Sequence, residues 1–238
     1  MQATTQRAER FTGNTVAQRP AIPSLLKPTE RDALALLEQF GTTVPVHRDH
    51  EICGEGDKAE YCYRILSGCV RTVRLMEDGR RQIGEFLMAG DLLGFDALGI
   101  YDFAAEAVCD VVLRRYPRRM VDALAENNFA LTRRLRDITS ISLRMANTRL
   151  VMLGRKTASE RIASFLLEML ERLPTARANV LDLPMGRSDI ADHLGLTIET
   201  VCRVLAHLRR EGTLSIDRSS IAVRDEAALQ QMASGTRH

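Results

Sequence analysis

Two consecutive segments near the C-terminal end of the chain carry apolar residues at the spacing of an α-helix. The apolar positions are Ile190, Ala191 and Leu194 in the first segment, and Val201, Val204, Leu205 and Leu208 in the second. Gly195 lies between them, at a corner where the backbone needs a residue that tolerates a positive φ. The pattern predicts two amphipathic helices joined by a tight turn.

The polar face of the second predicted helix carries Glu199 and Arg203, with Cys202 at its flank. Residues four positions apart project from the same side of a helix. An arginine fork pairs with O6 and N7 of guanine in the major groove of DNA, and a carboxylate accepts from the N4 amino group of cytosine. The pair therefore predicts a DNA-reading helix. An exposed helical ion pair worth about 0.2–0.5 kcal/mol is the alternative.

The segment after this helix favours the DNA-reading interpretation. Gly212 is followed by two short apolar runs, 213–216 and 221–223, on either side of the polar turn 217–220. Two such runs around a polar turn predict a β-hairpin, which would be the wing of a winged helix-turn-helix.

Upstream, glycines punctuate residues 52–116 and separate short runs of β-branched and aromatic residues. The dipeptide Asp78-Gly79 is the strongest short hairpin signal among them. This spacing predicts a compact antiparallel β-barrel or β-roll. Together with the C-terminal helices it predicts an α+β fold.

A long helix is predicted over about 128–154, between the roll and the helix-turn-helix. Its seam alternates steps of four and three, and its members are Leu131, Leu135, Ile138, Ser142, Met145 and Met152. Such a seam is typical of a two-stranded coiled coil and predicts a parallel homodimer. The dimer would set two reading helices one helical turn apart on a palindromic operator. A core helix that packs on its own roll is the alternative.

These elements divide the chain into four regions. We expect a flexible N-terminal arm over 1–24, a sensor-like β-roll over 25–127, a dimerisation helix and hinge over 128–156, and a DNA-binding domain over 157–238. A capping box from Thr157 to Glu160 predicts the start of the last region, with the hinge at Arg155-Lys156.

The string GLTIETVCRVL resembles the recognition segment of the CRP/FNR superfamily of bacterial transcription regulators, whose pattern is Glu-x-x-Ser-Arg or Glu-x-x-Gly-Arg. Here Cys202 stands where Ser or Gly is usual. Ile198, just before the glutamate, is similar to the FNR and FixK branch. The Gly54-Glu-Gly-Asp57 segment and Gly90-Asp91 are similar to the superfamily's cyclic-nucleotide-binding-type roll. The resemblance covers about residues 25–232 and is closest to FixK-type members.

The resemblance implies an activator that binds an FNR/FixK-type box as a homodimer and works with RNA polymerase, in microaerobic life or nitrogen fixation. The residues expected at the DNA are Arg187, Thr197, Ile198, Glu199, Thr200, Cys202 and Arg203. Arg203 would contact guanine and Glu199 cytosine. Arg187 and the helix start at Thr197 would hold phosphates.

The resemblance also raises the question of an effector. Cyclic-nucleotide-binding members carry Gly-Glu and then an Arg-Ser pair that clamps the cyclic phosphate. Here Asp91 replaces the glutamate, and residues 103–107 place Glu106 near the expected arginine, where it would repel a phosphate. We therefore expect no cyclic nucleotide, although a cyclic-nucleotide-responsive regulator remains the alternative function.

No metal or other cofactor is expected either. The five cysteines are Cys53, Cys62, Cys69, Cys109 and Cys202, and an FNR-type iron–sulfur cluster needs three closely spaced thiolates nearer the N-terminus. His47 and His50 have metal-like spacing but no recognisable partner ligands nearby.

Cys202 is the candidate regulatory residue because the helical wheel places it beside the DNA-facing side. Oxidation to a sulfinate or sulfonate would add negative charge there and repel DNA. The nearby Arg203 would favour the reactive thiolate. The alternative is that cysteine fills a serine-sized site.

Composition and motifs argue against a membrane protein and an enzyme but do not decide whether the protein binds nucleic acid. A net charge of +2 is too small to diagnose nucleic-acid binding. No apolar run of about 18 residues and no signal-peptide pattern occurs, so we expect a cytoplasmic protein without a membrane partner. No nucleophile–base pair or phosphate loop suggests an enzyme.

Overall fold

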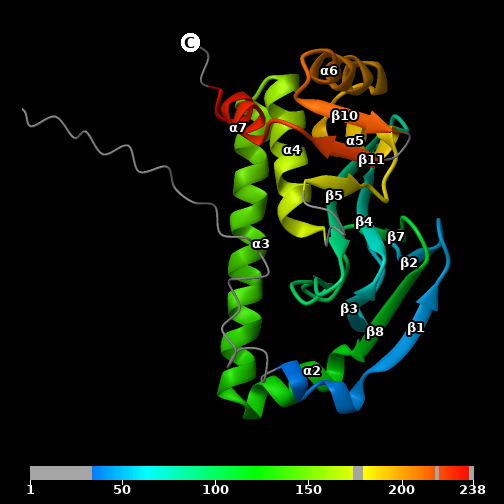
Figure 1. The fold of residues 1–238 in the computed structure, drawn as a ribbon. Helices are drawn as coiled ribbons and strands as arrows, with labels where there is room; N and C mark the ends of the chain where they lie inside the picture. Colours follow the sequence, from blue (N-terminus) through cyan, green and yellow to red (C-terminus); the bar gives the residue numbers. More distant parts are fainter. Residues whose placement is uncertain (1–33, 174–178, 218–219, 236–238) are drawn as a thin grey trace, which may run out of the picture.

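The computed structural model describes residues 34–173, 179–217 and 220–235. The arm predicted for residues 1–24 and positions 218–219 of the predicted wing turn lie outside these ranges. Figure 1 shows a β-roll, a long helix that runs beside it, and a smaller C-terminal domain at one end of that helix. The predicted α+β architecture is confirmed.

The roll consists of two four-stranded antiparallel sheets. In order across the sheet, the strands of the first are β1 (Thr42–Val46), β8 (Val111–Pro117), β3 (Tyr61–Ser67) and β6 (Leu92–Leu93). Those of the second are β2 (Glu51–Cys53), β7 (Ala104–Ala107), β4 (Cys69–Leu75) and β5 (Arg81–Met88). A short 3-10 helix, η2 (Glu38–Phe40), precedes β1.

Strand β7 shows which side chains face the roll interior. Ala105 and Ala107 are fully buried in the core between the sheets, beside Leu87 and Tyr63. Because side chains alternate along a strand, Glu106 projects from the opposite face. The sequence alone predicts that Glu106 repels a phosphate within the roll, and the structure corrects this prediction. The structure instead turns this carboxylate outward, where it pairs with Arg71.

The β4–β5 hairpin confirms the Asp-Gly signal. Gly79 has a φ of 82°, and the Asp78 carboxylate accepts a hydrogen bond from the Arg80 N–H at 3.0 Å. A positive φ carries little cost only for glycine, so the residue type fits the turn. The hairpin leaves the roll toward the C-terminal domain (Figure 1).

Two helices follow the roll, α2 (Arg118–Asn127) and the 27-residue α3 (Phe129–Arg155). The Asn128 side chain caps α3 by accepting from the Leu131 N–H at 2.9 Å. Helix α3 runs the length of the molecule and delivers the chain to the C-terminal domain (Figure 1). Its limits agree within about one residue with the predicted long helix.

The C-terminal domain packs helices on a three-stranded sheet of order β10-β11-β9. Its elements are α4 (Ala158–Arg172), β9 (Val180–Asp182), α5 (Arg187–Leu194), α6 (Ile198–Arg210), β10 (Leu214–Asp217), β11 (Ser220–Val223) and α7 (Glu226–Ser234). Strands β10 and β11 form the predicted wing hairpin, with Asp217 opposite Ser220.

The junction between α3 and α4 is short and tightly bonded. Thr157 and Glu160 form the predicted capping box. The Arg161 guanidinium donates to the carbonyl oxygens of Leu153 at 2.7 Å, Lys156 at 3.0 Å and Leu194 at 2.9 Å. One side chain therefore ties the end of the long helix to the turn after α5.

The roll and the C-terminal domain share one apolar core. The His193 ring of α5 lies between Phe86 of β5, at 5.0 Å between ring centroids, and Phe165 of α4, at 5.8 Å. Its Nδ1 lies 3.0 Å from Arg149 Nη1 of α3. The ring also donates a hydrogen bond to the Ile83 carbonyl. His193 thus contacts the roll, the long helix and its own domain.

The surroundings of His193 predict how stability depends on pH. Burial, the positive charge of Arg149 and that of Arg172 lower its pKa well below 6.5, with the Ile83 carbonyl opposing. The folded protein therefore holds His193 neutral while the unfolded chain binds a proton below pH 6.5. We expect the free energy of unfolding to fall by about 1.4 kcal/mol per pH unit below that value, until the pH reaches the folded pKa.

Urea unfolding from pH 8 to pH 5 measures this slope. In the His193→Gln variant, which cannot titrate, the acid slope should be shallower than in the wild type. The matched control is His207→Gln on the exposed side of α6, which should keep the wild-type slope. An equal slope in wild type and His193→Gln would contradict the prediction.

Candidate DNA-binding site

The α5–α6 corner has the geometry that the sequence predicts. Gly195 adopts the left-handed conformation with a φ of 61°, and the Leu196 N–H returns to the Ala191 carbonyl at 3.0 Å. Thr197 then caps α6, because its hydroxyl oxygen accepts from the Thr200 N–H at 3.2 Å. These local bonds end α5, begin α6 and fix the angle between the two helices.

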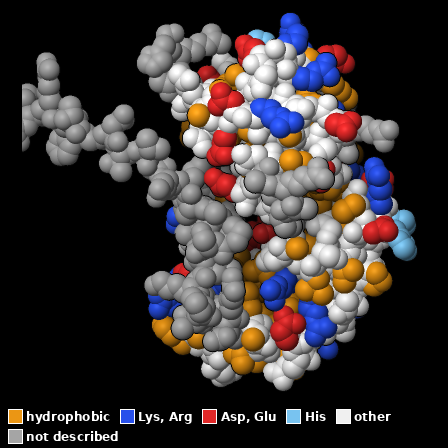
Figure 2. All heavy atoms as spheres, in the orientation of Figure 1, with side chains coloured by type: hydrophobic (Ala, Val, Ile, Leu, Met, Phe, Trp, Pro, Cys, Tyr) orange, Lys and Arg blue, Asp and Glu red, His pale blue; other side chains and the backbone are white. Residues whose placement is uncertain are grey.

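Helix α6 buries one face and exposes the other. Val201, Val204, Leu205 and Leu208 are buried against α4, α5 and β10. Glu199, Cys202 and Arg203 are exposed on the opposite face. Figure 2 shows blue side chains, with red ones among them, at the end of the molecule where Figure 1 draws α6. A major groove admits an α-helix presented in this way.

Glu199 is oriented by its own helix start and not by Arg203. Its backbone N–H and the Thr197 hydroxyl donate to the carboxylate and lower its pKa, so the group is charged at neutral pH. In the part of the chain that the structure describes, no ion pair joins Glu199 to Arg203. The alternative of an exposed helical ion pair therefore has no support in the structure.

The other residues predicted at the DNA surround this pair. Ile198 is 45% exposed at the first turn of α6, and Thr200 is half-buried. Arg187, at the first turn of α5, is also half-buried. Burial lowers the pKa of its guanidinium, and the neighbouring Cys202 opposes that shift. The predicted residues from both helices thus meet on one side of the domain.

Cys202 differs from the other cysteines in its surroundings. Burial raises the pKa of the Cys53 and Cys69 thiols to about 12 and that of Cys62 to about 11. Such thiols are unreactive because the thiolate is the nucleophile. Cys109 is half-buried, whereas Cys202 is exposed beside Arg187.

Helix α3 places half of the predicted seam against its own chain. Leu131 is fully buried with Val121 of α2, Leu135 packs on the same cluster, and Met152 packs on the shared core. The exposed apolar side chains on α3 are Phe129 (83%), Leu143 (63%), Leu150 (70%) and Val151 (61%). Leu143 and Leu150 are seven residues apart, a heptad repeat that the sequence also carried.

The described ranges contain neither a cluster of metal ligands nor a membrane-spanning helix. Within them, no group of three or more His, Cys, Asp or Glu side chains could hold a metal ion. No helix in these ranges is long and apolar enough to cross a membrane. On the face shown in Figure 2, acidic and basic side chains are interspersed over the roll.

Comparisons with known proteins agree with this geometry. Residues 43–128 match the cyclic nucleotide-binding domain family, and residues 160–232 match the Crp-like helix-turn-helix domain family. The nitrogen fixation regulation protein FixK of Azorhizobium caulinodans is 42% identical over 82% of this chain and 80% of its own length. The transcriptional activatory protein AadR of Rhodopseudomonas palustris is 35% identical over 90% of this chain and 89% of its own.

Among solved structures, FixK2 from Bradyrhizobium japonicum superposes with a TM-score of 0.79 at 39% identity, covering 83% of this chain and 99% of that one. The two matched domains, the extent of the FixK and AadR similarity and the exposed reading helix lead to one family. The chain belongs to the CRP/FNR family of transcription regulators.

Proposed function

We propose that the protein binds a palindromic FNR/FixK-type operator as a homodimer and activates transcription with RNA polymerase in the cytoplasm. The observation that carries the proposal is the exposed face of α6, where a charged Glu199 and Arg203 project without pairing to each other. The names of FixK and AadR add a role in nitrogen fixation or in activation. We infer that the target genes serve microaerobic life.

The two side chains divide base reading between them. Arg203 is the bidentate donor to guanine, and Glu199 accepts from a cytosine amino group. A carboxylate near DNA phosphates is unfavourable unless a donor meets it, so Glu199 is better suited to a base edge than to the backbone. Arg187 and the N-terminal turn of α6 at Thr197 hold phosphates and set the register of the helix.

The loss of Arg203 tests base reading. In the Arg203→Ala variant, operator binding should weaken by about 1–3 kcal/mol and sequence preference at one base pair should relax. Binding to a library of operators with single base changes measures both effects. Arg209→Ala, an exposed arginine on another side of the same helix, is the matched control and should leave the preference intact. A uniform loss on all sequences would contradict base reading by Arg203.

For the homodimer, the surface of α3 suggests the contact. We infer that Leu143 and Leu150 lie at its centre, because both are exposed, both are apolar and they repeat at the heptad spacing. Ile138, Ser142 and Met145 from the predicted seam are half-buried and would flank it. Leu131 is fully buried within its own chain and lies outside this contact.

A charged substitution tests this contact. Leu150→Glu should convert the dimer to a monomer, because a carboxylate would be buried against its symmetry mate. Operator affinity should fall with it, since each half-site would then be bound singly. Sedimentation equilibrium measures the change. Thr148→Glu adds the same charge on another side of α3 and should remain dimeric. A dimeric Leu150→Glu protein would contradict the proposed interface.

We infer further that oxidation of Cys202 switches DNA binding off. The side chain is exposed, lies beside Arg187 and flanks the reading face. Each oxidation step transfers one oxygen atom from hydrogen peroxide to sulfur and releases water, first to the sulfenic and then to the sulfinic acid. The sulfinate carries a negative charge next to DNA phosphates, which opposes binding.

Two substitutions at Cys202 test the switch. Cys202→Ser should bind the operator with or without peroxide pretreatment, and Cys202→Asp should bind weakly in both conditions, because it carries the charge permanently. Gel-shift titrations of the wild type and both variants measure this. Peroxide sensitivity that persists in Cys202→Ser would rule out Cys202 as the sensor.

A further inference from the structure

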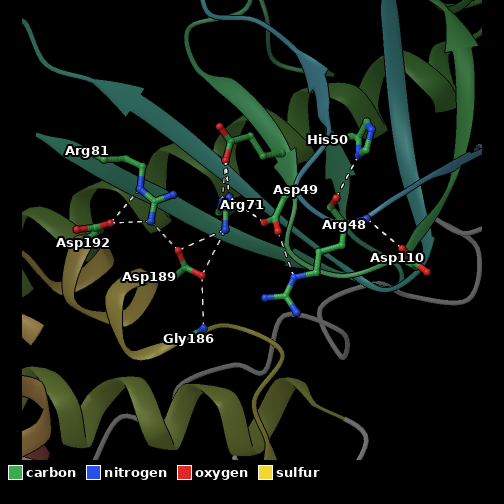
Figure 3. Close-up of polar contacts among 10 residues, drawn as sticks. Arg48, Asp49, His50, Arg71, Arg81, Asp110, Gly186, Asp189 and Asp192 are labelled. Atoms are coloured by element: carbon green, nitrogen blue, oxygen red, sulfur yellow. Dashed lines mark hydrogen bonds and ion pairs between the residues drawn. The ribbon is translucent and has the colours of Figure 1, made fainter. Parts of the chain in front are cut away.

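A network of ion pairs crosses the boundary between the roll and the C-terminal domain. Figure 3 shows Arg71 of β4 and Arg81 of β5 reaching from the roll to Asp189 and Asp192 of α5. The partners are 108 to 118 residues apart in sequence. Helix α5 is the first helix of the helix-turn-helix, and it packs directly on the reading helix α6.

Arg71 holds carboxylates from both domains. Its Nε donates to Glu106 Oε2 at 2.8 Å, and its Nη1 donates to both Asp189 oxygens at 3.4 Å. Glu106 is the cross-strand neighbour of Arg71 in the roll. Asp49 approaches Arg71 Nη2 at 3.4 Å. Without the Arg71 guanidinium, Glu106 would lose this cationic partner, and Asp189 would depend on Arg81.

Arg81 makes the second connection. Its guanidinium donates to Asp192 Oδ2 at 2.9 Å and to Asp189 Oδ1 at 2.7 Å. Asp189 also accepts from the Gly186 N–H at the start of α5, so its direction is fixed within its own helix. The neighbouring Gln82 donates to the Asp192 carbonyl at 2.7 Å. Two adjacent residues of β5 thus hold two turns of α5.

The burial of the pairs separates them from ordinary surface ion pairs. The side chains of Arg71 and Asp189 are each only 11% exposed, and those of Arg81 and Asp192 are 27% exposed. Exposed pairs contribute little, whereas breaking a buried pair leaves an uncompensated charge. The apolar core at Phe86 and His193 attracts the two domains without a strict direction. The two arginines supply the direction, because each guanidinium is planar and its donors bond more than one carboxylate at once.

We propose that Arg71 and Arg81 are positioning residues for DNA binding, which clamp α5 to the roll and thereby set the orientation of the reading helix. They form an interdomain clamp whose acidic half, Asp189 and Asp192, belongs to the DNA-binding domain. The clamp touches no DNA. It limits the directions in which the reading helices of a dimer point, so that both engage their half-sites together. The affinity measurements that test this inference rest on the proposed operator binding, whereas calorimetry does not.

Substitution of Asp192 tests the clamp, because the clamp and general electrostatics predict opposite changes in operator affinity. Asp192→Asn removes one negative charge, and by charge alone it should tighten binding to DNA. The clamp predicts the opposite result, an operator affinity lower by about tenfold. The matched control is Asp78→Asn on the exposed turn of the same hairpin, where binding should stay equal or tighten slightly. Equal or tighter binding by Asp192→Asn would overturn the proposal.

The arginine side is tested in the same full-length protein. Arg81→Met should weaken binding to a similar extent, while Arg80→Met, which removes an exposed arginine that pairs with Asp78 on its own turn, should not. The slope of log affinity against log salt should stay at the wild-type value, because no phosphate contact is lost. The double variant of Arg81 and Asp192 should cost less than the sum of the single ones. A reduced salt slope or strict additivity would count against the clamp.

Calorimetry tests the clamp without DNA. The wild type should unfold in one transition, and Arg71→Met should separate the unfolding of the roll from that of the C-terminal domain. If Arg71→Met does not fold, the partly exposed Asp192→Asn serves instead. If the wild-type protein bound no operator, the proposed function would be refuted, but the calorimetric test of the clamp would remain valid. A single transition in both clamp variants would overturn the clamp itself.

Discussion

The contact between β5 and α5 determines where the reading helix lies relative to the rest of the chain. Phe86 and Ile83 of β5 enter the same core as the helices of the C-terminal domain, and His193 of α5 is enclosed by them. Burial of apolar surface stabilises by about 25 cal/mol per Å², and the part of this core that Ile83 and Phe86 contribute is buried where the two domains meet. The DNA-binding domain is therefore a continuation of the roll and not an appendage on a linker.

The polar groups at this boundary are arranged around that core. Arg149 of the long helix contacts His193. Arg172 of α4 donates to the Phe86 carbonyl at 2.8 Å and pairs with Asp91 of the roll. Arg161 connects the junction between α3 and α4 to the end of α5. Arg149 comes from α3, Arg161 and Arg172 come from opposite ends of α4, and each ends on a different partner. Because hydrogen bonds are directional while apolar contacts are not, this set restricts rotation of the domain about its apolar contact.

The elements that sequence patterns located correctly are those specified by neighbouring residues. Gly195, the Thr157–Glu160 capping box and the Asp78-Gly79 turn act within four residues of chain, so their consequence is visible in the string itself. The apolar repeat on α3 does not by itself show which side of the helix is buried, because that helix has two apolar sides. Periodicity shows that Leu131 and Leu150 belong to different stripes. Only the packed structure shows that Leu131 meets its own chain and Leu150 meets solvent.

The contacts across the domain boundary had no comparable signal. Arg71 and Asp189 are separated by 118 positions, and each is an unremarkable charged residue in its own segment. The outward direction of Glu106 depends on the register of β7, which residues 103–107 alone do not reveal. One clue was present in α5, where Asp189 directly precedes the apolar residues of the packing face. A carboxylate at that position, buried on folding, requires a cationic partner from elsewhere.

The two sides of α5 therefore carry opposite charges with separate partners. Asp189 and Asp192 face the roll, where Arg71 and Arg81 neutralise them, and Arg187 faces Cys202 and the reading helix. Neutralisation matters because an unpaired carboxylate within a Debye length of DNA, about 8 Å at physiological salt, opposes the approach of phosphates. Docking on the roll thus leaves the cationic side of this short helix away from Asp189 and Asp192, as the proposed phosphate contact of Arg187 requires. This arrangement explains how a chain with a net charge of only +2 can present a DNA-binding surface.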